Sequence, residues 1–229
     1  MSRIRGIIFD MDGVLIDARE WHYEALNKAL ALFGHEINRD AHLTVFDGLP
    51  TREKLIRLSE TRGLPVSLHT FVNRMKQLYT LQLVAERCTP LATHHHALSI
   101  LREQGYKLAV ASNSVRSSVD TMLNKAGLRQ YLDFTLSNED VHQGKPHPEI
   151  YYKAISCMGL QPQECLVVED NPHGIAAAVA AGTHVLRVND PGEVQLSRIL
   201  SFIKVCESRQ KLMHRELRSD RYLSWPEPI

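Results

Sequence analysis

Four carboxylates, one lysine and a serine–asparagine pair stand where short apolar segments of the chain end. The carboxylates are Asp10, Asp12, Glu169 and Asp170, the lysine is Lys145, and the pair is Ser112 and Asn113. Carboxylates gathered in one place repel one another and stay ionised only if a cation sits among them. An all-oxygen set of ligands without His or Cys favours a hard metal, most often Mg²⁺. The residue types therefore predict a Mg²⁺ site.

A Mg²⁺ ion with a lysine and a serine opposite it suits a phosphoryl group. The metal and Lys145 would neutralise the phosphoryl charge, while Ser112 and backbone N–H groups at a helix start would bind its oxygens. Asp12 follows Asp10 by two residues, so that the two carboxylates can reach opposite sides of one phosphoryl group. A carboxylate acting as acid and base there contributes on the order of 10²–10⁴-fold to the rate.

The elements that must position these side chains alternate between strand and helix. The apolar runs predict strands over Ile4–Phe9, Lys107–Ala111, Leu132–Leu136, Cys165–Val168 and His184–Val188. Helical spacing between the later strands predicts helices over Thr93–Gln104, Val115–Ala126, Pro148–Met158 and Gly174–Ala181. This alternation predicts a parallel sheet, in which ligands bind beyond the carboxyl ends of the strands. The fold class predicted is α/β.

The stretch between Asp17 and Cys88 has no strand signal and predicts a helical insert. One helix is expected from Asp17, as its N-cap, through Phe33, a second over Thr51–Arg62 with Leu55, Ile56 and Leu58 inward, and a third over Leu68–Glu86. We therefore expect a core of residues 1–16 and 89–203 and an insert of residues 17–88. Residues 204–229 are expected as a C-terminal extension, either a packing arm, an oligomer contact or a loosely attached tail.

Four ordered motifs resemble those of the haloacid dehalogenase-like hydrolase superfamily. They are Asp10-Met11-Asp12-Gly13-Val14, Ser112-Asn113, Lys145-Pro146 and Glu169-Asp170. The strings GKPHPE at 144–149 and VEDNPHGIAAA at 168–178 are similar to its phosphatase and beta-phosphoglucomutase-like subgroup. The resemblance covers about residues 4–188. It implies a Rossmann-like three-layer core with an inserted all-helical cap.

The resemblance also implies a role for each motif residue. Asp10 would be the nucleophile that forms an aspartyl-phosphate, and Asp12 would protonate the leaving oxygen and then activate water. Ser112, with Asn113 beside it, would bind the transferring phosphoryl group, and Lys145 would hold that group against Asp10. The metal ligands would be Asp10, the backbone carbonyl of Asp12, and Asp170, with Glu169 close by.

Each motif also has an ordinary structural explanation. Asp10 and Asp12 could cap a turn, Ser112-Asn113-Ser114 could cap a helix, Lys145 could be a surface lysine, and Glu169-Asp170 could face a helix dipole. The occurrence of all four together, in this order, favours the phosphoryl site. The complete set also argues against a non-catalytic binding module that has kept the fold.

The insert corresponds to the cap of the family, which closes over a small substrate and excludes water. His22, Arg52 and Lys76 are the candidate cap contacts with the substrate, and Arg52 follows a segment, Gly48–Thr51, that is similar to the family's recognition loop. The alternatives are a partly exposed helix residue for His22, a solvated helix start for Arg52 and a solvent-exposed side chain for Lys76. His94, His95 and His96 lack the i,i+4 spacing of metal-binding pairs and predict a polar rim.

The predicted activity is Mg²⁺-dependent hydrolysis of a small phosphomonoester such as a sugar phosphate. The alternative is a beta-phosphoglucomutase-like phosphosugar mutase. In that subgroup a threonine after the DxDGVxxD string positions the acid–base aspartate and couples it to cap closure. Ala18 stands at this place and favours hydrolysis, while His22 and Arg52 remain compatible with a mutase.

Composition places limits on partners and compartment. Lys and Arg number 27 and Asp and Glu 26, a net charge of +1 that argues against nucleic-acid binding. The two acids at positions 10 and 12 exclude a signal-peptide core, and no apolar run approaches the roughly 20 residues of a membrane span. The four cysteines form no CxxC pair, which indicates reduced thiols. We expect a cytoplasmic monomer or weak homodimer.

Overall fold

A five-stranded parallel sheet forms the centre of the protein in the computed structural model, which describes residues 3–46 and 49–219, with side chains up to residue 209. The strand order is β3-β2-β1-β4-β5. The strands are β1 (Gly6–Phe9), β2 (Lys107–Ala111), β3 (Phe134–Leu136), β4 (Cys165–Glu169) and β5 (His184–Arg187). β1 pairs in parallel with both β2 and β4, so the strand nearest the N-terminus lies in the middle of the sheet. The predicted α/β class is confirmed.

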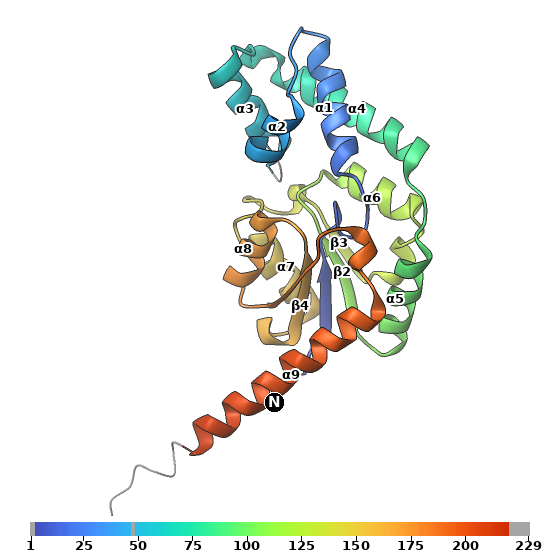
Figure 1. Ribbon diagram of the computed structural model, residues 1–229, viewed down its shortest axis with the longest axis vertical. Coiled ribbons are helices and arrows are strands. Elements are labelled where there is room, and N and C mark those ends of the chain that lie inside the picture. Colours follow the sequence, from blue (N-terminus) through green and yellow to red (C-terminus); the bar gives the residue numbers. More distant parts are fainter. Residues whose placement is uncertain (1–2, 47–48, 220–229) are drawn as a thin grey trace, which may run out of the picture.

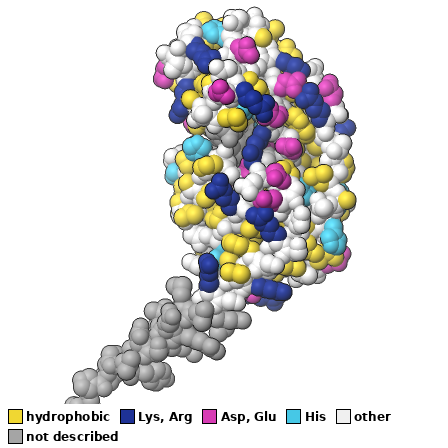
Figure 2. All heavy atoms as spheres, viewed as in Figure 1, with side chains coloured by type: hydrophobic (Ala, Val, Ile, Leu, Met, Phe, Trp, Pro, Cys, Tyr) yellow, Lys and Arg dark blue, Asp and Glu magenta, His cyan; other side chains and the backbone are white. Residues whose placement is uncertain are grey.

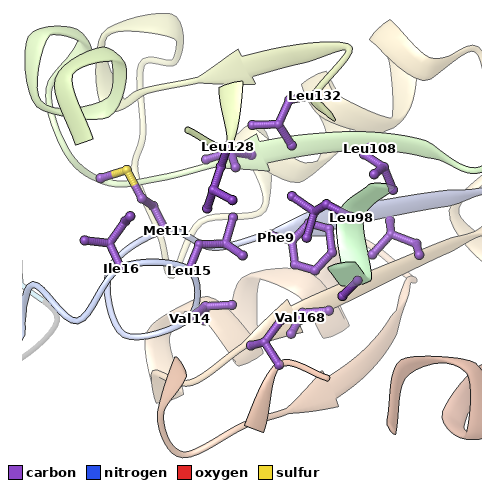
Figure 3. Close-up of a cluster of buried hydrophobic side chains, with 14 of the residues drawn as sticks. Phe9, Met11, Val14, Leu15, Ile16, Leu98, Leu108, Leu128, Leu132 and Val168 are labelled. Atoms are coloured by element: carbon purple, nitrogen blue, oxygen red, sulfur yellow. The ribbon is translucent and has the colours of Figure 1, made fainter. Parts of the chain in front are cut away.

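Helices cover both faces of the sheet and make three layers (Figure 1). One face carries α5 (Ala92–Glu103), α6 (Arg116–Lys125) and α9 (Leu196–Ser219), and the other carries α7 (Glu149–Met158) and α8 (Pro172–Ala180). Side chains of a strand point alternately to the two faces. Phe9 and Val168 accordingly belong to the first apolar layer (Figure 3), whereas Ile8 belongs to the second.

The turn after β1 is fastened into the first apolar layer. Met11, Val14, Leu15 and Ile16 are all buried there, beside Phe9 and Leu98 (Figure 3). The Met11 carbonyl accepts hydrogen bonds from the amides of Leu15 and Ile16 at 3.0 and 2.9 Å. Because its apolar side chains anchor this turn, the polar residues between them are held in fixed positions at the edge of the sheet.

The inserted helices form a separate lobe above the sheet edge (Figure 1). They are α1 (Arg19–Ala31), α2 (Arg39–Ala41), the π-helical turn η1 (His42–Phe46), α3 (Thr51–Arg62), the short turn η2 (Val66–Leu68) and α4 (His69–Arg87). Their buried side chains, among them Leu30, Leu58 and Val72, form an apolar cluster of their own. This lobe is the helical cap. Four further short turns lie in the core at Arg129–Tyr131, Asn138–Asp140, Pro162–Glu164 and Pro191–Glu193.

Several local expectations for the cap were wrong. The N-cap of α1 is Ala18 rather than Asp17, and α1 ends at Ala31, so Phe33 lies beyond it and meets Phe71 edge-on at 5.7 Å. Ile56 is 41% exposed, although Leu55 and Leu58 are buried. Successive helical residues are rotated by about 100°, which turns Ile56 away from the face that its neighbours bury.

The chain after β5 forms the long helix α9, which runs away from the sheet at the lower edge of Figure 1. Ile199, Ile203 and Cys206 are buried on one face, at helical spacings of four and three. The predicted extension from residue 204 is thus helical up to Ser219, and its residues 220–229 lie outside the described part. Among the described helices, none is both long and apolar enough to span a membrane. Positive and negative side chains are interspersed on the face shown in Figure 2.

Candidate active site

The first acidic motif begins directly where β1 ends. The Asp10 amide donates to the Val168 carbonyl of β4 at 3.0 Å, which fixes Asp10 against the neighbouring strand. Asp12 lies two residues on, in the anchored turn. Gly13, directly after Asp12 in this turn, has φ +90°, and a side chain there would lie 2.7 Å from the Arg19 Nε atom. Only glycine fits both this conformation and this crowding.

The segment after β2 supplies hydroxyl and amide groups. Ser112 is buried, and its Oγ accepts from the Ser114 amide at 3.0 Å. Ser114 Oγ in turn donates to Asp12 Oδ2 at 2.7 Å. The helix-capping explanation of this segment is wrong, because α6 has Val115 as its N-cap and no side-chain cap. Asn113 Oδ1 accepts from the Lys145 amide at 3.0 Å, and Asn113 Nδ2 donates to the Lys145 carbonyl at 3.2 Å. Asn113 therefore positions Lys145.

Lys145 lies at the centre of the buried charges. Its Nζ atom is 2.5 Å from Asp10 Oδ1 and 2.7 Å from Glu169 Oε1, and it lies 4.9 Å from the centre of the Tyr151 ring. Burial lowers the pKa of Lys145, but the two carboxylates outweigh burial and raise that pKa well above its ordinary value. The lysine is therefore an ammonium group, and it is not the surface side chain of the alternative explanation.

Glu169 is held by four hydrogen bonds. Oε1 accepts from Lys145 and from the Tyr151 hydroxyl at 3.1 Å, and Oε2 accepts from the amides of Asp170 and Asn171 at 2.8 and 3.0 Å. The first turn of α8 is capped by Asn171, not by an acid. Glu169 therefore orients Lys145 and joins the sheet edge to α8.

Asp10, Glu169 and Asp170 form an acidic group suited to a metal ion. Each offers an oxygen, and these oxygens lie within 4.8 Å of one another. Burial is the main cause that raises the pKa of Asp10 well above its usual range, and the neighbouring acids add to it although Lys145 opposes them. Burial likewise raises the pKa of Asp170 to about 6. Asp170 Oδ1 is a buried oxygen with no hydrogen-bond partner among the described residues. An all-oxygen set with an unpartnered carboxylate oxygen fits Mg²⁺, which would favour the ionised forms.

The Asp12 carboxylate points away from this acidic group and toward the cap. Asp12 Oδ1 lies 3.1 Å from His22 Nε2, and His22 Nδ1 lies 3.1 Å from Lys76 Nζ. An ammonium group can only donate, so His22 Nδ1 accepts and its Nε2 carries the proton that faces Asp12. Burial raises the pKa of Asp12, but His22, Ser114 and Lys76 together lower it below its usual value.

The alternative explanation of Lys76, a solvent-exposed side chain, is wrong. The side chain is buried between α1 and the sheet edge, and burial lowers its pKa to about 8. The burial of His22 and the nearby charge of Lys76 lower the pKa of His22 in turn. Two of the three candidate cap contacts, His22 and Lys76, therefore lie close to Asp12. The third, Arg52, is exposed at the start of α3.

A cavity of about 230 Å³ lies between the sheet edge and the cap. Its walls include the motif residues Asp10, Asp12, Ser112, Asn113, Lys145, Glu169 and Asp170 and the cap residues His22, Arg52 and Lys76. All ten candidate site residues predicted from the sequence therefore line one cavity. A cavity between two lobes is a common place for a small-molecule site.

Sequence reasoning missed several charged or hydroxyl groups of this cavity, among them Ser114, Lys54 and Arg19. Ser114 was seen only as part of a capping segment, Lys54 is buried on α3, and Arg19 forms an ion pair with Asp170. Arg19 also donates to the Asn189 carbonyl at 3.0 Å. Their proximity to the acids depends on how the cap packs over the sheet, and no local pattern signals it.

The histidine run is not a polar rim. His94 is fully buried, and its Nε2 lies 2.8 Å from the Pro191 carbonyl. His95 contacts the Tyr131 hydroxyl and the Ala126 carbonyl at 3.1 and 2.9 Å, and His96 is exposed. The first two are thus structural residues that join α5 to neighbouring loops.

Known proteins are similar to this chain over most of its length. Residues 7–188 match the family described as haloacid dehalogenase-like hydrolase. The chain is 30% identical over 179 residues to the phosphorylated carbohydrates phosphatase of Thermotoga maritima, which covers 78% of this chain and 82% of that protein. It is 27% identical over 187 residues to the pyrophosphatase PpaX of Bacillus cereus, covering 82% of this chain and 84% of the relative.

Solved structures share the fold. The beta-phosphoglucomutase of Clostridium difficile superposes with a TM-score of 0.76 at 23% identity, covering 88% of this chain and 97% of that one. CbbY of Rhodobacter sphaeroides, in complex with phosphate, superposes with a TM-score of 0.74 at 24% identity, covering 80% and 85%. At these identities the likeness establishes the three-layer core and its helical cap.

Proposed function

The chain belongs to the haloacid dehalogenase-like hydrolases and is a phosphatase, and we propose that it hydrolyses a small phosphomonoester such as a sugar phosphate, with Mg²⁺, through an aspartyl-phosphate on Asp10. The observation that carries the proposal is the position of Asp10. Its carboxylate is held by Lys145 at 2.5 Å, within the acidic group and at the base of the cavity. A carboxylate fixed in this way loses little orientational freedom when it attacks phosphorus.

Two displacements at phosphorus complete the reaction. In the first, an Asp10 oxygen bonds to phosphorus, the bond to the leaving oxygen breaks, and Asp12 gives that oxygen its proton. In the second, water attacks the aspartyl-phosphate, Asp12 takes a proton from the water, and Asp10 is released with inorganic phosphate. Splitting one difficult displacement into two is the benefit of covalent catalysis.

Asp12 is suited to both proton transfers. Its lowered pKa keeps it ionised in the free enzyme, the form that accepts a proton from water. The first step needs Asp12 protonated, and a negative phosphoryl group beside it favours that form. Ser114 hydrogen-bonds Asp12 Oδ2, and His22 Nε2 lies 3.1 Å from Asp12 Oδ1, so Ser114 fixes the carboxylate on one side while Oδ1 stays available for proton transfer.

The remaining groups stabilise the phosphoryl charge. Ser112 and Lys145 would bind phosphoryl oxygens, and Asn113 would keep Lys145 in place. Mg²⁺, held by Asp10, Asp170 and the Asp12 carbonyl, would neutralise the charge that develops on the phosphoryl oxygens. Glu169 would act through Lys145, because its own oxygens already accept four hydrogen bonds.

The cap supports a small phosphorylated substrate. We take residues 17–88 as the cap, and His22, Arg52 and Lys76 as its contacts with the part of the substrate beyond the phosphoryl group. The phosphorylated carbohydrates phosphatase of Thermotoga maritima, at 30% identity, makes a sugar phosphate the first substrate to test. The cavity of about 230 Å³ beneath the cap is the space that such a substrate would enter.

A phosphosugar mutase is the second candidate. His22 lies between Asp12 and Lys76, where it could couple the acid–base group to a sugar in the cavity, and this favours a mutase. Ala18 favours hydrolysis, because it lacks a hydroxyl that could hold Asp12 away from water until the cap closes.

One experiment tests the proposal and separates the two candidates. The protein is incubated with a hexose 1-phosphate, with Mg²⁺ or with EDTA, and both products are followed by phosphorus NMR. We expect inorganic phosphate, little 6-phosphate, no turnover in EDTA, and near-background turnover by Asp10→Asn. Efficient conversion to the 6-phosphate would favour the mutase, and undiminished activity in EDTA would refute the metal site.

The matched variant is Ala18→Thr. A hydroxyl at position 18 that held Asp12 back would slow hydrolysis roughly 2- to 13-fold, the rate equivalent of one hydrogen bond of about 0.5–1.5 kcal/mol. Unchanged hydrolysis by this variant would show that Ala18 does not decide between phosphatase and mutase. The identity of the products would then decide between the two activities.

A further inference from the structure

Arg19 connects three parts of the protein that meet at the candidate metal site. It is the first residue of α1, and so belongs to the cap. Its guanidinium forms an ion pair with Asp170 Oδ2 and donates to the Asn189 carbonyl, just after β5, at 3.0 Å. It also lies against Gly13 in the turn after β1.

Asp170 presents two different oxygens to its surroundings. Oδ2 is engaged by Arg19, whereas Oδ1 is buried and has no hydrogen-bond partner among the described residues. The side chain of Asp170 is 3% exposed and that of Arg19 40% exposed. A positive charge carried by the cap therefore touches the carboxylate that would also hold a metal ion.

We propose that Arg19 is a cap-borne counter-ion of the metal site, which opposes Mg²⁺ binding at Asp170 for as long as α1 lies over the sheet edge. The proposal rests on the metal site of the proposed function. Arg19 and Mg²⁺ are like charges that share one carboxylate, so each weakens the binding of the other. Because binding free energies are reciprocal, a bound Mg²⁺ ion would equally weaken the hold of Arg19 on Asp170.

Arg19 also stabilises the acidic group when no metal is bound. Among the described residues, two cations directly contact the acidic group formed by Asp10, Glu169 and Asp170. Lys145 pairs with Asp10 and Glu169, and Arg19 pairs with Asp170. Removing Arg19 would leave these carboxylates less compensated, so that a divalent cation is more strongly attracted. At an effective dielectric constant near that of water, about 80, a unit charge some 5–6 Å away alters divalent-ion affinity by about tenfold, and a lower dielectric constant enlarges the effect. Partial exposure of Arg19 places the expected effect near tenfold.

Calorimetric titration with MgCl₂ measures the effect without turnover. We expect Arg19→Gln to bind Mg²⁺ about tenfold more tightly than the wild type, and Arg19→Lys, which keeps the charge, to stay within about twofold of it. Arg5→Gln is the matched control: it removes the same charge from a surface pair with Glu164, 3.1 Å apart, which lies where β1 and β4 begin, opposite the site. Its affinity for Mg²⁺ should equal that of the wild type.

Thermal unfolding gives a second readout. In EDTA, Arg19→Gln should melt below the wild type, and addition of Mg²⁺ should raise its melting temperature by more than it raises that of the wild type. Equal or weaker Mg²⁺ binding by Arg19→Gln would overturn the proposal and show that Arg19 only positions Asp170. Failure of the wild type itself to bind Mg²⁺ would instead overturn the metal site of the proposed function.

Discussion

Gly174 tests whether the buried carboxylate of Glu169 holds the site together. It lies in the first turn of α8, where an added β-carbon would overlap that carboxylate, with Glu169 Oε2 only 2.6 Å away. Glycine costs a helix about 1 kcal/mol relative to alanine, so helix propensity alone predicts that Gly174→Ala stabilises the protein. The site geometry predicts the opposite, because the new carbon must displace Glu169.

The size of the loss follows from the bonds that Glu169 makes. Displacement disturbs its ion pair with Lys145 and its hydrogen bonds from Tyr151 and from two backbone amides. Breaking a buried ion pair costs about 3–5 kcal/mol. After subtraction of the helix gain, we expect Gly174→Ala to lower the free energy of unfolding by about 2–4 kcal/mol. For a chain of this length, that corresponds to a fall in melting temperature of roughly 4–16 °C.

Circular dichroism measures the melting temperature, and hydrolysis of p-nitrophenyl phosphate measures the site. Activity should fall on the order of 10²-fold, because Lys145 would lose its fixed position beside Asp10. The control is Gly174→Ala in the Glu169→Ala background, where no carboxylate remains to be displaced. There the substitution should be neutral or stabilising. A single Gly174→Ala variant at least as stable as the wild type would refute the reasoning.

Three further predictions concern residues of the cavity. Ser114→Ala should lower kcat roughly 2- to 13-fold, because it removes one hydrogen bond to Asp12 worth about 0.5–1.5 kcal/mol. The control Ser118→Ala removes a hydroxyl that donates to Gln77 and should leave kcat unchanged, and equal kcat values for both variants would contradict the role of Ser114. Lys76 has a pKa of about 8 when folded and near 10.5 when unfolded, so the unfolded chain binds more protons between these pH values and the free energy of unfolding should rise by about 3 kcal/mol across them. Denaturant unfolding at pH 8 and 10.5 should show this rise in the wild type, and its persistence in Lys76→Met would contradict it. Asp170, with a folded pKa of about 6, should make the metal-free protein lose stability as the pH rises from about 4 to 6, a slope that Asp170→Asn should reduce in the same assay.

Much of the core was predictable from the chain alone. Short apolar runs with glycine after the following helices place the strands within a few residues, and β2 begins and ends where the pattern predicts. The carboxyl ends of parallel strands meet at one edge of the sheet, so Asp10, Ser112 and Asp170 had to come together once the strands paired. The helical cap followed in the same way, from the lack of strand signals before Cys88.

The arrangement over that edge was decided by the tertiary structure. The sequence left open whether Lys76 faces the cavity or solvent, and the side chain is buried. Arg19 belongs to no motif and pairs with Asp170, and His94 was expected on a rim but lies in the interior. Ser114, in the segment after β2, hydrogen-bonds Asp12, 102 residues away in the chain. Such contacts depend on the angle at which the cap helices pack over the sheet, which no local pattern contains. Local sequence determines which residues end a strand, because hydrogen bonding and hydrophobic periodicity act over a few residues, whereas burial and charge pairing between lobes follow from packing across the whole chain.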